Sequence, residues 1–313
     1  MLFLRNIGKP SAVVGGLFLA LISMTKLSAC SVCGCGDPLL AAGSAVPMAG
    51  QFRLSVDGEY LYATAAGADL GTTEFLAQET LRPVLVYSPG TSLSLVLQVP
   101  LIRKDWWTND SAEPLLATDN FGLGDVDLGG RWFFWQDLHL VDRWSQNLAL
   151  SAGISLPTGD SNITVNGQLI DQHAQIGTGA VGPYFGLLYG YNGDPWGVSL
   201  NVTYRYRGTN YQGYQFGQAL SFGVAGHYRV FENLSLTLGL DGRYAEHDQD
   251  WSVGRANGDT GGTVLDVTPG FGWQIGDGIG VTGRVQVPVY TDLFGTQLVT
   301  PTCDLSVQYV FSL

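Results

Sequence analysis

Apolar and polar residues alternate along most of this chain. Apolar residues occupy every second position from Leu234 to Leu240, and the same period of two runs through residues 148–156 and 196–207. A period of two places all the apolar members on one face of a β-strand. The alternation begins near Gln51 and continues to the last residue, so it predicts an all-β fold.

The length of the alternating runs indicates where the apolar face lies. The runs last about 12 to 17 residues, whereas strands of soluble domains cluster near 5 or 6 residues. Tilted strands that cross a bilayer and project beyond it need this reach. The length therefore favours a transmembrane antiparallel β-barrel, with its apolar face outward, over the alternative of a periplasmic β-sandwich.

The connections between the runs alternate in length, which is typical of bacterial outer-membrane barrels. Turn-forming residues give tight connections at 88–90, 192–195, 232–233 and 276–278, and longer polar loops lie near 65–75, 107–121, 159–174, 247–262 and 294–301. We predict about twelve strands, at 51–64, 76–88, 91–105, 122–136, 146–158, 175–191, 196–209, 214–231, 234–246, 263–276, 279–293 and 302–313. An even number of strands places both termini on the short-turn, periplasmic side. The segment 137–145 is long for that side, and we expect a periplasmic helical turn there.

Composition supports a membrane barrel of the Gram-negative cell envelope. Charged residues make up 13% of the chain, and 43 residues are glycine. The fraction of charged residues is low for a protein whose surface must be solvated, and the number of glycines is high. The formal net charge is −12, and an acidic chain without a basic stripe argues against a nucleic-acid partner.

The first 29 residues have the features of a secretory signal peptide. Arg5 and Lys9 precede an apolar run from Ala12 to Met24 that is too short to span a bilayer, and small residues follow up to Ala29. We therefore expect export and an outer-membrane location; the alternative is a buried N-terminal helix. Leu27–Cys30 also has the form of a lipobox, in which Cys30 would be lipidated after cleavage.

Residues 30–50 form a short cysteine-bearing segment before the barrel at 51–313. Cys30, Cys33 and Cys35 lie within six residues and could bind a thiolate-preferring metal such as Cu(I) or Zn(II), with a fourth ligand from elsewhere. A disulfide is the alternative in an oxidising periplasm, and lipid anchorage through Cys30 is a third. Apart from this possible thiolate-bound metal, we expect no cofactor. Cys303 lies at the long-loop end of the last strand, far from a periplasmic N-terminus.

Strand parity predicts which ionisable side chains face the barrel lumen. A charge facing lipid at the bilayer midplane would cost about 2–4 kcal/mol, so charged positions opposite the apolar face should point inward. These positions are Arg53, Asp57, Glu59, Asp125, Asp127, Arg131, Arg205, Arg207, His227, Arg229, Asp241, Arg243, Asp266, Arg284 and Asp304. Either these groups only neutralise one another in a narrow lumen, or the arginines form a selectivity lining for an anionic or polar solute.

The sequence lacks the signatures of an enzyme. The four histidines are His139, His173, His227 and His247, and none is accompanied by a nucleophile motif. The glycine pattern at 122–125 opens a strand and not a helix, so it lacks the geometry of a phosphate-binding loop. We predict no catalytic residues; an outer-membrane hydrolase using His173 or His247 remains a third hypothesis.

Several segments together resemble an outer-membrane transporter-like family named for the meta-pathway of phenol degradation, distantly related to fatty-acid channel barrels. Their order and spacing carry the resemblance, since each motif alone is common. The motifs are Gly122-x-Gly124-Asp125 with Gly129-Gly130-Arg131-Trp132, Leu156-Pro157-Thr158-Gly159-Asp160, Gly177-Thr178-Gly179, Val287-Pro288-Val289-Tyr290 and Gly295-x-Gln297. The resemblance implies a barrel with a role in the uptake of hydrophobic or aromatic compounds.

The leading hypothesis is therefore an outer-membrane channel or transporter-like protein for small molecules. Residues 30–50 would act as a periplasmic or luminal plug. Its expected partners are outer-membrane lipid, a small-molecule solute and the outer-membrane assembly machinery, which reads an alternating C-terminal strand such as 305–313. The alternative is a structural or redox-accessory barrel whose cysteine segment binds metal or docks a periplasmic partner.

Overall fold

The computed structural model describes residues 47–66, 72–110, 117–139, 141–295 and 297–312. The predicted signal peptide and the three N-terminal cysteines lie outside these ranges. No helix in the described part of the chain is long and apolar enough to cross a membrane.

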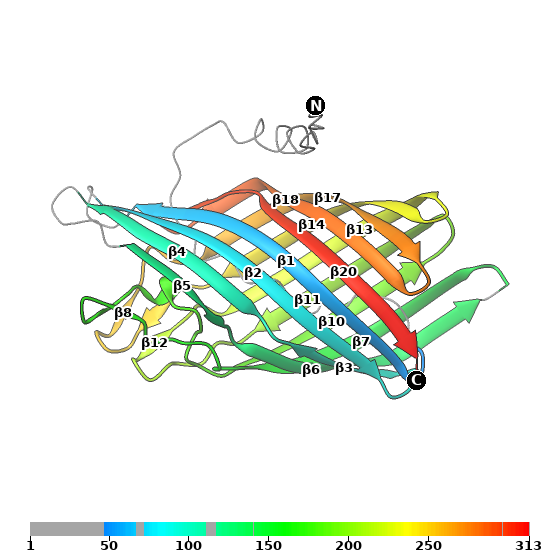
Figure 1. Cartoon of the computed structure of the whole chain (residues 1–313), viewed down its shortest axis with the longest axis horizontal. Helices are drawn as coiled ribbons and strands as arrows, with labels where there is room; N and C mark the ends of the chain where they lie inside the picture. The colour runs from blue at the N-terminus through cyan, green and yellow to red at the C-terminus, as the bar shows by residue number, and fades with distance from the viewer. Residues whose placement is uncertain (1–46, 67–71, 111–116, 140, 296, 313) are drawn as a thin grey trace, which may run out of the picture.

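The chain forms a closed antiparallel barrel with twelve wall strands (Figure 1). Strand β1 pairs with β2 on one side and with β20 on the other, which closes the wall. The wall strands follow one another around the barrel in chain order, as β1 (Gln51–Ala66), β2 (Thr72–Ser88), β3 (Leu93–Gln98) with β4 (Leu101–Asp110), β5 (Ala117–Leu123) with β6 (Val126–His139), β7 (Trp144–Leu156), β10 (Gly182–Asn192), β11 (Trp196–Arg205), β13 (Ala219–Phe231), β14 (Leu234–Ala245), β17 (Gly262–Gly276), β18 (Ile279–Leu293) and β20 (Thr302–Ser312). The fold class and the strand number are as predicted.

Two of the wall strands are interrupted where single strands were predicted. Strands β3 and β4 both pair with β2 and are separated at Pro100, which has no N–H to donate to a ladder. Strands β5 and β6 are separated at Gly124 and Asp125, and the Gly124 N–H donates to the carbonyl of Pro100 at 2.8 Å. A Cβ at Gly124 would lie 2.6 Å from Ile102 Cδ1 and 3.0 Å from Pro100 Cγ, so a larger residue there would displace the Ile102 side chain.

The outer face of the wall is apolar over its middle. Leu236, Leu238 and Leu240 of β14 are exposed, and Leu238 is 62% exposed. Aromatic rings stack near both ends of the strands, as with Phe52 and Tyr87 near the short turns and Phe75 and Trp107 near the long loops. An apolar band flanked by aromatic rings is the exterior of a barrel that spans a lipid bilayer.

The described ends of the chain lie at the short-turn end of the barrel. Gln51 pairs with Ser88 and with Ser312. At the opposite end, the long loops carry two small sheets, one of β8 (Thr164–Val165) and β9 (Gln168–Leu169), the other of β12 (Tyr214–Gln215), β15 (Gln249–Asp250) and β16 (Arg255–Ala256). The short strand β19 (Gln297–Val299) adds to β1.

The predicted helical turn at 137–145 is wrong. Strand pairing between β6 and β7 continues as far as His139 and Trp144, so the connection is an extended hairpin. The ring of His139 stacks on that of Trp144 with centroids 3.9 Å apart, which supports the strand ends beyond the apolar band.

Candidate functional site in the barrel lumen

Much of the chain between β7 and β10 folds into the barrel, and we call residues 157–181 the luminal segment. It contains the 3-10 turn η1 (Gln172–Ala174), and Ala174, Gln175 and Ile176 are almost fully buried. The predicted outer loop at 159–174 therefore lies only partly outside. Its β8–β9 hairpin is exposed with the other long loops, whereas Ile170 and Ala174 are packed inside. The strand predicted from residue 175 begins only at Gly182. A run of buried backbone cannot join the wall ladder and needs other hydrogen-bond partners.

Lys104 of β4 supplies partners for this buried backbone. Its ammonium donates to the carbonyl oxygens of His173 at 2.8 Å and Gln175 at 2.6 Å. The Gln175 amide in turn accepts from the N–H of Ile163 and donates to the carbonyls of Ile163 and Ile170. The luminal segment is therefore held by satisfied polar groups and not only by packing.

Apolar packing holds the same segment against the wall. Leu76 of β2 and Trp106 of β4 form a buried cluster with Ile170 and Ala174. The luminal segment covers these inward-facing apolar side chains and shields them from solvent.

Three of the glycine-bearing motifs meet at Asp125. One oxygen of Asp125 accepts from the Gly159 N–H at 3.0 Å, and the other accepts from the N–H and hydroxyl of Thr178 at 2.8 and 2.6 Å. Thr158 bridges the break in the wall, because its hydroxyl donates to the Gly124 carbonyl and accepts from the Val126 N–H. The sequence contained these motifs, but their spacing gave no sign that they bind one another.

A cluster of His173, Tyr214 and Asp248, which we call the loop clasp, links the luminal segment to two long loops. His173 Nε2 lies 2.7 Å from Asp248 Oδ2, and the Tyr214 hydroxyl donates to the same oxygen at 2.6 Å. The Gly217 N–H donates to the other Asp248 oxygen at 2.7 Å. Asp248 was not predicted as a site residue, since it lies in a polar loop with no strand parity.

The clasp changes the pKa values of its members. Burial alone would lower the pKa of His173, but the Asp248 carboxylate raises it above the ordinary value. Burial alone would raise the pKa of Asp248, but His173 and the hydrogen bonds from Tyr214 and Gly217 lower it. Burial and the nearby Asp248 charge also raise the pKa of Tyr214, which stays a hydrogen-bond donor.

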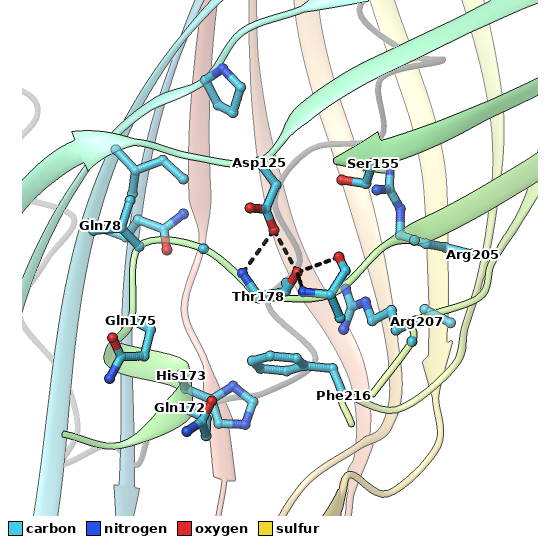
Figure 2. A pocket seen from close by; sticks show the side chains of 18 of the residues that line it. Gln78, Asp125, Ser155, Gln172, His173, Gln175, Thr178, Arg205, Arg207 and Phe216 are labelled. Carbon is cyan, nitrogen blue, oxygen red and sulfur yellow. Dashed lines mark hydrogen bonds between the residues drawn. The ribbon is translucent and has the colours of Figure 1, made fainter. Parts of the chain in front are cut away.

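A luminal cavity of about 170 Å³ lies between the wall and the luminal segment (Figure 2). His173 and four Lys or Arg residues line it, and the figure places Arg205 and Arg207 on one side and Gln78 and Gln175 on the other. The four Lys and Arg residues are Lys104, Arg205, Arg207 and Arg243. The lining also contains Asp125 and apolar side chains.

Several of the ionisable groups predicted to face the lumen pair with each other or with polar neighbours. Glu59 forms a buried ion pair with Arg82, a residue not predicted for the lumen. Other contacts of these groups are Asp127 with Arg205 at 3.4 Å, Arg284 with Asp304 at 3.1 Å, Asp57 with Ser306, and Asp241 with Thr268 at 2.6 Å. These contacts account for the buried charges of the groups named here.

The remaining residues that were predicted to face the lumen lie at different heights along the barrel. Arg53 and Arg131 line a smaller cavity near the short turns, and Arg229 pairs there with Asp194 at 3.2 Å. His227 lies opposite Gly197 in the ladder, where a Cβ would meet its ring. Asp266 lies opposite Asp241.

The predicted metal, disulfide and lipid sites stay predictions. Cys30, Cys33 and Cys35 lie outside the described residues. Within the described ranges no group of three or more His, Cys, Asp and Glu residues could hold a metal ion. Cys303 of β20 has no disulfide partner among the described residues.

Comparison with known proteins places this architecture among outer-membrane barrels. The fold is similar to the crystal structure of an outer membrane channel from Pseudomonas putida F1, with a TM-score of 0.63 and 16% identity over 89% of this chain and 99% of that chain. Weaker likenesses are the translocator domain of the autotransporter NalP from Neisseria meningitidis (TM-score 0.45, 12% identity, 87% and 92% covered) and the CymD monoaromatic hydrocarbon channel (0.43, 8%, 90% and 94%).

No curated protein matches the sequence. Residues 38–295, however, match a protein family over most of the barrel. The chain belongs to the family described as "Putative MetA-pathway of phenol degradation".

Proposed function

We propose that this chain is an outer-membrane channel that passes small hydrophobic or aromatic molecules through its lumen. The observation that carries the proposal is a cavity of about 170 Å³, inside a closed barrel with an apolar exterior. The family is described as one of phenol degradation, and the similar solved structure is that of an outer membrane channel. The family description agrees with an aromatic solute, and the similar structure agrees with a channel.

The size of the cavity limits the solute. Twelve strands enclose a lumen between that of filled eight-stranded barrels and open porins of sixteen or more strands. The luminal segment occupies part of this space. A buried cavity of about 150 Å³ is enough to bind benzene, so the remaining cavity suits a solute with a single ring and excludes a disaccharide.

The ion pairs of the lumen have a structural role in this proposal. Glu59 with Arg82 and Arg284 with Asp304 neutralise charges that the wall directs inward. The groups around the cavity, by contrast, are proposed to contact the solute. We therefore expect the solute path to pass Arg205 and Arg207, and not the ion pairs near β1 and β20.

The proposal is tested with the full chain in vesicles that have a lipopolysaccharide outer leaflet, which slows unaided entry of apolar solutes. Entry of radiolabelled phenol and maltose is followed by rapid filtration, with protein-free vesicles of the same composition as control. We expect phenol to enter several-fold faster with the protein and maltose to be unaffected, because only phenol fits the cavity. Equal phenol rates with and without the protein would refute the proposal.

A further inference from the structure

We infer that the luminal cavity binds single-ring aromatic anions, carboxylates in particular, in preference to neutral rings of the same size. The inference rests on the proposed channel function for the route by which a solute reaches the cavity. It names the class of solute that the cavity retains there.

The charge of the lining is the first argument. Lys104, Arg205, Arg207 and Arg243 line the cavity, and Asp125 is the one carboxylate among the described lining residues. Both oxygens of Asp125 already accept hydrogen bonds from Gly159 and Thr178. The chain as a whole carries a formal charge of −12. The cavity lining, in which cationic side chains outnumber carboxylates, is therefore opposite in sign to the chain. A lining of one sign concentrates ligands of the opposite sign.

The arginine geometry is the second argument. The Arg205 guanidinium lies 4.9 Å from the ring centre of Tyr184, and that of Arg207 lies 5.8 Å from the ring centre of Phe216. These cation–π contacts restrain the position of each guanidinium, whose paired N–H groups match the two oxygens of a carboxylate. Figure 2 shows Arg205 and Arg207 on the same side of the cavity.

Arg205 is only loosely bound to its acidic neighbour. Its contact with Asp127 Oδ1 is 3.4 Å, longer than the usual 2.7–2.9 Å or so of charge-assisted hydrogen bonds. A ligand carboxylate would share this guanidinium with Asp127.

Apolar groups supply the surface for the ring. Ile102, Ile176 and Phe216 belong to the same lining as the arginines. Burial of a ring against them is favourable, and the volume of about 170 Å³ leaves room for one ring with a small anionic group. The combination of a cationic side and apolar side chains fits an aromatic carboxylate better than either a plain ion or a plain hydrocarbon.

Equilibrium binding to the full chain in detergent micelles tests the inference, with benzoate, benzyl alcohol and acetate as probes in titration calorimetry at low salt. We expect benzoate to bind at least tenfold more tightly than either other probe, because only benzoate uses both the cations and the apolar surface. Arg207→Gln should weaken benzoate about tenfold and change benzyl alcohol less than twofold. Arg143→Gln, with the same charge change on an exposed side chain at the short-turn end, is the matched control and should leave benzoate unchanged.

Three results would overturn the inference. Equal binding of benzoate and benzyl alcohol would remove the role of charge, and equal binding of acetate and benzoate would remove the role of the ring. Equal losses in the Arg207 and Arg143 variants would show a general charge effect and no site. If Arg207→Gln does not fold, as judged by its thermal melting, Arg243→Gln takes its place. Selective binding without phenol entry into vesicles would refute the channel and leave this inference standing.

Discussion

At the residue scale, the loop clasp joins three stretches of chain that are far apart in the sequence. His173 is 26% exposed and Asp248 is almost fully buried. A buried carboxylate is stable only while it is paired and hydrogen-bonded. The charge state of the clasp therefore controls how firmly the luminal segment is tied to the loops of Tyr214 and Asp248.

The clasp should hold within a limited pH range. The pKa of His173 lies above its ordinary value of 6.5, so the attraction is complete below that value and is lost as the pH rises through the raised pKa. The pKa of Asp248 lies below its ordinary value of 3.8, so its contribution is complete above that value and is lost as the pH falls through the lowered pKa. Asp171 also favours protonated His173, and Lys104 opposes it.

We predict that amide hydrogen exchange in residues 170–176, corrected for the intrinsic rate, becomes faster as the pH rises through the raised His173 pKa. The reason is that neutral His173 no longer attracts Asp248. Mass spectrometry of the protein in micelles measures the exchange. His173→Gln should remove the pH dependence; the same dependence in this variant would assign it to another group.

A second prediction concerns the contact of Gly159 with Gly177. A Cβ at Gly177 would lie 2.5 Å from the backbone carbon and oxygen of Gly159, so Gly177→Ala must push the luminal segment away from the Asp125 anchor. We expect a loss of about 1–3 kcal/mol in the free energy of unfolding, as for other overpacked sites.

Urea unfolding measures this loss, with Gly258→Ala as the matched control, because a Cβ there meets nothing within 4 Å. If the two variants lose the same stability, the close approach of the two glycines does not limit the fold.

At the element scale, β4 explains what the sequence could and could not predict. A period of two located the wall strands, because lipid outside and polar groups inside impose it on every strand. In β4 the pattern reverses: Arg103 and Asp105 face outward, and Ile102 and Trp106 face inward. Arg103 forms a bidentate pair with Asp119 of β5 on the outside, and the luminal segment covers the inside.

Strand parity therefore predicts which side chains face the lumen only where a strand has lipid on its outer side and open lumen on its inner side. Lys104 was missed for this reason, although it is the one lysine after the predicted signal peptide. The meeting of Asp125 with Thr178 and of His173 with Asp248 could not be predicted either. These contacts depend on how a long polar loop folds back, and no periodic pattern records that.

The luminal segment should also limit conduction. Its residues 161–176 begin and end at a closure point, since the Gly177 N–H donates to the Asp160 carbonyl at 2.8 Å. Replacing 161–176 with two glycines should leave the wall intact and raise single-channel conductance in planar bilayers several-fold, because a twelve-stranded lumen would then be less filled.

The control for this deletion is the exposed turn 251–254 in a long loop outside the cavity lining. Replacing it with two glycines should leave the conductance unchanged. An unchanged conductance after removal of 161–176 would mean that another part of the chain closes the lumen.

At the scale of the whole molecule, the site depends on the barrel being inserted in lipid with its apolar belt outward. Leu238 lies midway along β14 between exposed Leu236 and Leu240, and Ile275 lies on β17 near a short turn. We predict that Leu238→Arg lowers the free energy of unfolding in lipid vesicles by about 2–4 kcal/mol and Ile275→Arg by about 0–1 kcal/mol, because the cost of a charge falls from the bilayer midplane to the interface.

Urea unfolding of the two variants in the same vesicles compares these costs directly. Both substitutions place the same charge on a side chain that is exposed on the barrel, 62% for Leu238 and 52% for Ile275, so a difference between them reports depth in hydrocarbon and not exposure. Equal costs would mean that water reaches the middle of the belt. The inward orientation of Glu59, Arg82 and Asp127 would then have no energetic cause, because a charge on the outer face would cost no more free energy than one in the lumen.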